Sequence, residues 1–86
     1  MSESNQDRLK RLKMRSWRRG TKEMDMVLGP YSDTQLVSLS EAQIVLYDAL
    51  LSENDHDLYQ WVTGQVQTPK PYLELLPLIS NFAFKS

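Results

Sequence analysis

The 86-residue chain contains no cysteine and a single histidine, His56. The absence of cysteine excludes a disulfide framework, a thiolate nucleophile and a zinc–thiolate site. A hydrolytic triad needs a base, but His56 lies between two aspartates at an expected helix start, so we interpret it as a solvated side chain. The acids are dispersed and predict no metal site. We therefore expect a protein that is not an enzyme.

Glycine and long apolar runs are also scarce. The three glycines (Gly20, Gly29 and Gly64) lie too far apart for a phosphate-binding loop or a dinucleotide fingerprint. No apolar run approaches the roughly 18–20 residues of a membrane-spanning helix. The basic N-terminus leads into no apolar secretory segment. We expect a soluble intracellular protein without membrane insertion and with no stably bound cofactor of its own.

Charge is divided unevenly along the chain, although the net charge is only −1. Residues 1–22 carry eight Lys and Arg against two carboxylates, whereas residues 23–86 carry two Lys against nine carboxylates. Such polarity predicts a protein partner with an acidic surface, or a nucleic acid. A basic helix face that is simply solvated is the third interpretation, and it stays open.

Hydrophobic spacing predicts an all-α protein of about five short helices. We expect residues 1–6 to be disordered and residues 7–86 to form one helical domain. No run of alternating β-branched residues competes with this prediction, and no internal repeat is visible.

The first half of the chain is expected to hold two helices and a short helical segment. The first helix covers residues 7–17, and the second begins at Thr21, which suits the N-cap position. Gly29-Pro30 should interrupt the second helix, because proline disfavours helical geometry in the residue before it. One or two helical turns then follow, with Leu36 and Val37 buried.

The second half is expected to hold three helices. Ser40 and Gln43 form a capping box that opens the clearest helix of the chain. Its expected core stripe has helical spacing and consists of Ala42, Val45, Leu46, Ala49 and Leu50, widened by Ile44, Tyr47 and Leu51.

Asn54 suits the N-cap of the next helix, which should bury Leu58, Trp61 and Val62 and stop at Gly64. Pro71 suits the first position of the last helix. Pro77 should kink or split that last helix.

Residues 14–25 concentrate cations, one indole and two carboxylates, and they are the segment most suggestive of function. Arg15, Arg19 and Glu23 stand at i, i+4 and i+8, so one continuous helix would present all three on one side. Gly20 interrupts that run at a cost of roughly 1 kcal/mol against alanine. We expect the glycine to serve an unusual backbone angle, a helix junction or a close approach of another backbone.

Trp17 and the charged pair within this segment each allow more than one interpretation. Trp17 packs onto the core, stacks with a guanidinium or anchors a partner, since tryptophan and arginine are both enriched at interface hot spots. Arg19 and Glu23 either form an exposed ion pair worth a few tenths of a kcal/mol or contact a partner.

Three segments stand in this order along the chain: Arg15–Asp25, Ser38–Ser40 and Leu58–Gly64. Together they resemble the SdhE family of succinate dehydrogenase assembly factors, also called flavinators, found in bacteria and mitochondria. The resemblance covers roughly residues 8–83, nearly the whole chain. Gly29-Pro30 and Pro77 depart from the pattern of many members.

The resemblance implies a five-helix domain that binds the flavoprotein subunit of succinate dehydrogenase, and often of fumarate reductase. It implies that the domain promotes covalent attachment of FAD to a histidine of that client, so FAD belongs to the client. The family's R-G-x-x-E motif falls on Arg19, Gly20 and Glu23. The partner-binding residues expected on this basis are Arg15, Trp17, Arg18, Arg19, Gly20, Glu23 and Asp25.

Each motif residue is assigned an expected role. Gly20 permits close approach of the client, and Arg19 pairs with an acidic or backbone oxygen of the client. Glu23 orients Arg19 or contacts a client cation.

We further expect a monomer when free, located in a bacterial cytoplasm, with the mitochondrial matrix as the alternative.

The competing hypothesis is a small nucleic-acid-binding or regulatory protein with a basic helix, whose binding would weaken steeply with salt. The acidic remainder of the chain and the lack of a helix-turn-helix pattern count against it. We therefore expect no nucleic-acid partner.

Overall fold

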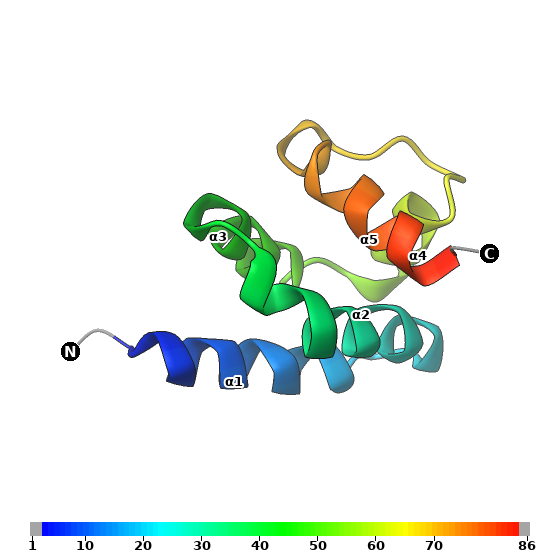
Figure 1. The fold of residues 1–86 in the computed structure, drawn as a ribbon. Coiled ribbons are helices and arrows are strands. Elements are labelled where there is room, and N and C mark those ends of the chain that lie inside the picture. The colour runs from blue at the N-terminus through cyan, green and yellow to red at the C-terminus, as the bar shows by residue number, and fades with distance from the viewer. Residues whose placement is uncertain (1–2, 85–86) are drawn as a thin grey trace.

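The computed structural model describes residues 3–84, which form five α-helices and two short 3-10 helices without any strand. The α-helices α1 and α2 lie together as one layer, and α3, α4 and α5 pack across them as a second layer (Figure 1). The all-α prediction with five helices is confirmed. The elements are α1 (Asn5–Trp17), α2 (Lys22–Gln35), η1 (Leu36–Ser38), α3 (Glu41–Leu50), α4 (Asp55–Val62), η2 (Lys70–Tyr72) and α5 (Leu75–Phe84).

The first helix begins earlier than predicted. The Ser4 side chain accepts a hydrogen bond from the Asp7 N–H at 3.1 Å, so Ser4 is the N-cap and α1 starts at Asn5. Placing residues up to Gln6 in a disordered segment was therefore wrong for Ser4 to Gln6. Residues 1 and 2 of that segment, and residues 85 and 86 of the expected domain, lie outside the described range.

The second helix continues through Gly29-Pro30 to Gln35, so the predicted interruption was wrong. The Trp17 indole lies flat against Gly29, where an added Cβ would overlap the ring. Glycine is therefore required here by close packing of α1 on α2. Pro30 leaves one carbonyl, that of Met26, without a helical donor. Met26 lies on an exposed face, where water can take the donor's place.

The core lies between the two layers and is built from one cluster of buried apolar side chains. Leu36 belongs to it as predicted, but Val37 is 70% exposed, because it lies in the short η1 turn after α2 has ended. The fully buried Tyr47 hydroxyl bonds Ser16 Oγ at 2.7 Å and so joins α3 to α1. The buried set comprises Leu12, Met24, Val27, Leu28, Tyr31, Leu36, Ile44, Tyr47, Leu50, Leu51, Leu58, Val62, Tyr72, Leu75, Leu76 and Ile79.

The buried face of α3 differs from the predicted core stripe by a rotation about the helix axis. Ile44, Tyr47 and Leu50 are buried, as is Leu51 just beyond the helix, but Val45 is 56% exposed. Ala42 and Ala49, also expected in the stripe, are exposed, and Leu46 is half-buried. The observed orientation buries the larger side chains, which gains more apolar area than burying two alanines and a valine.

The local signals in the second half of the chain were predicted more accurately. The capping box of Ser40 with Gln43 is present, and Asn54 caps α4 by accepting the His56 N–H at 2.8 Å. Gly64 ends that segment with a φ of 81°, in the left-handed region that favours glycine. Leu58 and Val62 are buried as expected, whereas Trp61 is half-buried against Tyr72.

The C-terminal segment is divided into η2 and α5, but this division comes before Pro77 and α5 continues through it, so the prediction that Pro77 splits the last helix was wrong. Pro71 lies in η2 and does not start the last α-helix, so this expectation was wrong. α5 begins at Leu75, which places Pro77 in its first turn, where a missing N–H costs no helical hydrogen bond. None of the described helices combines the length and apolar character needed to cross a bilayer.

Candidate functional site

The R-G-x-x-E motif lies at the junction between α1 and α2. α1 ends at Trp17, and Thr21 caps α2 by accepting the Met24 N–H at 3.3 Å. A single helix presenting Arg15, Arg19 and Glu23 on one side therefore does not exist, and the alternative of a helix junction at Gly20 is confirmed. Within residues 3–84 Gly64 alone has a positive φ, so Gly20 does not serve an unusual backbone angle.

Asp55, at the start of α4, holds this junction in place. Its Oδ1 accepts from Arg19 Nε at 2.9 Å and lies 2.7 Å from Arg19 Nη2. Its Oδ2 accepts the backbone N–H of Gly20 and, at 3.1 Å, that of Thr21. A Cβ built on Gly20 would lie 3.1 Å from the same Oδ2. The close approach that explains Gly20 is therefore made within the molecule, by Asp55.

The Arg19 side chain is turned inward and is not available on the surface. Its exposed fraction is 8% and that of the Asp55 side chain is 9%. The guanidinium also donates to the carbonyl oxygens of Leu51 at 2.8 Å and Glu53 at 3.3 Å, where α3 has just ended. A cation at the C-terminal end of a helix is favoured by the helix dipole. Arg19 therefore ties the motif to the α3–α4 connection.

Asp25 and Glu23 have different environments. Asp25 Oδ1 accepts the Arg19 backbone N–H at 2.7 Å, so this carboxylate also fixes the junction from within. Glu23 is exposed and, in the part of the chain that the structure describes, makes no hydrogen bond or ion pair with Arg19. The expectations that Glu23 orients or pairs with Arg19 are wrong for the free protein, and its carboxylate faces solvent.

Trp17 packs against its own fold and also keeps an exposed edge. The indole lies on Gly29, and its Nε1–H lies 3.2 Å from each carboxylate oxygen of Asp33 in α2. Its exposed fraction is nevertheless 42%. Trp17 thus joins α1 to α2 while leaving part of the ring accessible beside Arg18, which is also exposed.

Half of the basic residues in positions 1–22 pair within the molecule. Arg11 and Arg15 both reach Asp48, and Arg8 reaches Glu41, so α1 is tied to α3 along its length. The Arg11 guanidinium lowers the pKa of Asp48, and that of Arg8 lowers the pKa of Glu41. The internal partners of the four arginines are Glu41 for Arg8 at 2.7 Å, Asp48 for Arg11 and Arg15 at 2.9 Å, Glu3 also for Arg11 at 2.9 Å, and Asp55 for Arg19 at 2.7 Å.

This pairing changes the interpretation of the charge asymmetry. Arg8, Arg11, Arg15 and Arg19 pair with acids of α3 and α4, so they are not a free basic surface. Among residues 3–84, no ion pair is formed by the other four cations of this region, and three of them are exposed. Those four are Lys10, Lys13, Arg18 and Lys22.

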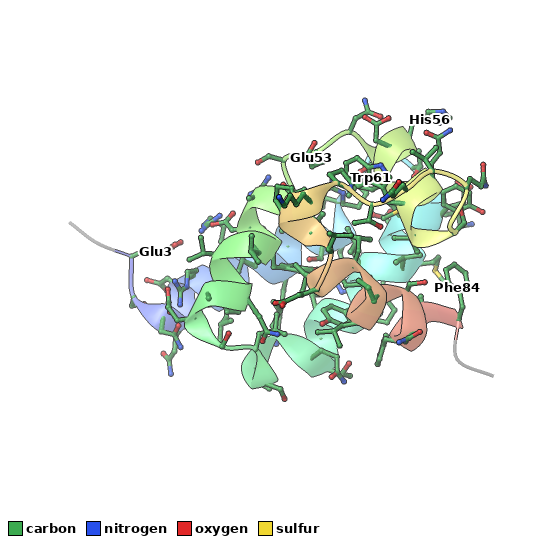
Figure 2. All side chains as sticks on the ribbon, turned by 90° about the horizontal axis from the view of Figure 1, so that it is seen from above. Glu3, Glu53, His56, Trp61 and Phe84 are labelled. Atoms are coloured by element: carbon green, nitrogen blue, oxygen red, sulfur yellow. The ribbon has the colours of Figure 1, made fainter. Side chains whose placement is uncertain are left out.

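The site therefore has a buried half and an exposed half. The loop is fixed from the inside of the molecule by hydrogen bonds of Arg19, Asp25 and Asp55. The exposed residues are Arg18, Gly20, Lys22 and Glu23. A shallow hollow beside the loop is lined in part by Arg18, Gly20, Asn54 and His56. His56 points outward from α4 and is exposed (Figure 2), which agrees with its interpretation as a solvated residue.

Sequence reasoning missed Asp55 as a member of the site. Asp55 was assigned only to the first turn of its helix, where any carboxylate is favoured. Its partner Arg19 lies 36 residues away, and no local pattern connects the two. The motif pointed to Arg19, but it did not indicate which acid would pair with that arginine.

Comparison with known proteins gives the family. A family model described as "Flavinator of succinate dehydrogenase" matches residues 10–83, which include the junction and Asp55. The chain belongs to this family. The resemblance of the three segments to the SdhE family is thus confirmed.

Curated relatives of this family member come from bacteria and from mitochondria. FAD assembly factor SdhE of Legionella pneumophila is 38% identical over 64 residues, which cover 74% of this chain and 81% of the relative. Mitochondrial succinate dehydrogenase assembly factor 2-B of Drosophila mojavensis is 39% identical over 75 residues, covering 84% of this chain and 48% of the relative. The chain spans about half the length of this mitochondrial relative.

Proposed function

We propose that this flavinator-family protein binds the flavoprotein subunit of succinate dehydrogenase and promotes covalent attachment of FAD to a histidine of that subunit. The observation that carries the proposal is the fixed junction loop. Asp25 and Asp55 hold Arg19 and the following backbone in place, while Arg18 and Glu23 remain exposed. A loop that is ordered before binding loses less conformational entropy when the client docks.

The proposed role is positioning, and the protein itself is not an enzyme. Attachment of a histidine to a flavin requires the two groups to be aligned and the developing negative charge on the flavin ring to be stabilised. FAD and the histidine both belong to the client. Arg18 and Lys22 would meet acidic groups of the client, and Glu23 would meet a client cation. The exposed edge of Trp17 would enlarge the contact.

The motif arginine has a different proposed role from the one expected from sequence. Arg19 has an indirect role, which is to fix the conformation of the junction loop. Its guanidinium already forms hydrogen bonds with Asp55 and with the carbonyl oxygens of Leu51 and Glu53. Arg15 likewise has an indirect role, because its ion pair with Asp48 stabilises the packing of α1 on α3. Arg18, Gly20, Lys22 and Glu23 supply the surface that the client touches.

A binding measurement with purified proteins tests the proposal. The flavoprotein subunit, prepared without covalent flavin, is titrated with wild type, Arg18→Ala, Glu23→Ala and the exposed control Lys70→Ala. Losing one interface hot spot should weaken affinity roughly tenfold or more. We expect that loss for the first two variants and no change for the control. Equal affinity for all four proteins would overturn the assignment of the surface.

Gly20→Arg is a less direct test of the same surface. A Cβ at Gly20 already lies 3.1 Å from Asp55 Oδ2, so a side chain there also disturbs the group that holds the loop. Loss of function in Gly20→Arg would therefore not separate contact from positioning. Arg18 and Glu23 are exposed and allow that separation.

The nucleic-acid alternative loses its main support. Its basis was the basic N-terminal segment, but four arginines of that segment face acids of α3 and α4. We propose a protein client, with fumarate reductase as a second client of the same type. We further propose that the protein acts as a monomer in a bacterial cytoplasm, with the mitochondrial matrix as the alternative location.

A further inference from the structure

An apolar hollow opens beside the motif, where α2, α4 and α5 meet. Its apolar lining comes from all three helices, with Met26 on α2, Tyr59 on α4 and Phe84 on α5. Figure 2 shows Phe84 projecting from the last turn of α5 on the side where the first turns of α2 (cyan) lie. The full lining is Lys22, Glu23, Met26, Val27, Tyr59, Ala83 and Phe84.

Two of the apolar side chains at this hollow, Met26 and Phe84, are exposed. Met26 is 63% exposed and Phe84 is 55% exposed, while Tyr59 and Ala83 are half-buried beneath them. Single exposed apolar residues are ordinary on a protein surface. Here they converge from separate helices on one concave place, which is typical of an interaction site.

The charged rim of the hollow belongs to the motif itself. Lys22 and Glu23 line its edge, and Met26 follows Glu23 by three residues, so both lie on the same side of α2. The motif glutamate thus belongs both to the exposed half of the site and to the lining of the apolar hollow. An apolar centre with a polar edge is the usual anatomy of a protein–protein interface.

We propose that this hollow is the apolar part of the client-docking surface and receives an apolar side chain from a segment of the flavoprotein subunit. The proposal rests on the proposed function and specifies more of its interface. The occupant carries a cation placed to meet Glu23 and an anion placed to meet Lys22, since those charges border the hollow.

Methionine suits the centre of such a surface. Its side chain is unbranched and its thioether is polarisable, so it adjusts to the shape of an inserted group. Met26 is not part of the core cluster of the free protein, and its side chain is 63% exposed. Replacing it should therefore leave the free protein's stability nearly unchanged while removing apolar contact from the bound state.

The test compares Met26→Asp with Val45→Asp in titrations of the flavoprotein subunit. Val45 is a matched control, because it is 56% exposed on α3 and does not line the hollow. We expect Met26→Asp to weaken client affinity about tenfold or more, as hot-spot residues do, with an unchanged thermal midpoint. Val45→Asp should bind like wild type. Phe84→Ala should repeat the Met26→Asp loss from a second helix.

The outcomes separate this inference from the proposed function. If Glu23→Ala weakens the complex while Met26→Asp and Phe84→Ala bind normally, the hollow is not part of the docking surface. The proposed function would not be affected by that result. Failure of the wild-type protein to bind the flavoprotein subunit would overturn the function itself. A wild-type dimer that Met26→Asp dissociates, with client affinity unchanged, would assign the hollow to a second copy of this chain and overturn its proposed occupant.

Discussion

The Asp55 carboxylate bridges the side chain of Arg19 and the backbone N–H groups of the two residues that follow it. One side chain at the start of α4 thereby fixes the whole turn that joins α1 to α2. Because the Arg19 and Asp55 side chains are both nearly buried, the motif stabilises the fold as well as forming part of a candidate binding surface.

Asp55→Ala should destabilise the protein strongly. The change leaves the Arg19 guanidinium buried without its carboxylate partner and removes the acceptor for two backbone N–H groups. Removing one member of a buried ion pair typically costs about 3–5 kcal/mol. Denaturant unfolding measures this, with Asp57→Ala in the same first turn as the control. Equal unfolding midpoints for the two variants would contradict the assigned role of Asp55.

Gly29→Ala should destabilise the protein because the new Cβ displaces the Trp17 indole. Overpacking of this kind costs about 1–3 kcal/mol, which exceeds the roughly 1 kcal/mol that alanine gains over glycine in a helix. The thermal midpoint and the fluorescence of Trp17 report the change. In a Trp17→Ala background the same substitution should become neutral or stabilising. A loss of the same size in both backgrounds would show that Trp17 is not the cause.

Acid should weaken the contact between α1 and α3. Hydrogen bonding with Arg11 lowers the pKa of Asp48 below its usual value in the folded protein. A lowered folded pKa means that the stabilisation is fully present above the unfolded pKa of about 3.9 and is lost as pH falls through the folded pKa. Asp48→Asn should therefore reduce stability at pH 7 and flatten the decline in stability between about pH 5 and pH 2.

The matched control for Asp48→Asn is Glu74→Gln, at an exposed acid between η2 and α5. It should leave the stability at pH 7 unchanged. Denaturant titrations at several pH values give the comparison. An Asp48→Asn protein with the same pH dependence as wild type would contradict the role of the Arg11–Asp48 pair.

Alkaline pH should weaken the contact between η2 and the α3–α4 connection. Burial, together with a hydrogen bond to Glu53 at 2.9 Å, raises the pKa of Tyr72 to about 12. A raised folded pKa favours the neutral phenol, so its stabilisation is present below the unfolded pKa of about 10 and is lost as pH rises toward 12. Tyr72→Phe should remove this part of the alkaline loss, measured by thermal unfolding between about pH 9 and pH 11. An unchanged alkaline slope would argue against the phenol as its source.

Signals that lie within a few residues of one another were predictable from sequence. Thr21, Ser40 and Asn54 each bond a backbone N–H two or three residues later, so their capping roles are local. Gly64 likewise ends its segment by its own backbone conformation. Five helices in one domain follow from such signals together with apolar spacing.

Features that depend on packing between distant segments were not predictable. Gly29-Pro30 signals an interruption locally, but Trp17 of α1 requires a glycine against it and α2 continues. The buried face of α3 depends on which of two overlapping stripes meets the other layer. The sequence could not assign a partner to Arg19, because Asp55 becomes its neighbour only when α4 packs at the α1–α2 junction.

The central claim is that the exposed half of the motif touches a client whose flavin becomes covalently attached. The most direct measurement uses cells lacking this protein, whose total protein is separated on a denaturing gel and scanned for covalent flavin fluorescence. We expect wild type and the Lys70→Ala control to restore the band of the succinate dehydrogenase flavoprotein, and Arg18→Ala and Glu23→Ala to restore it poorly. A band of full intensity in the absence of the protein, or with every variant, would contradict the account.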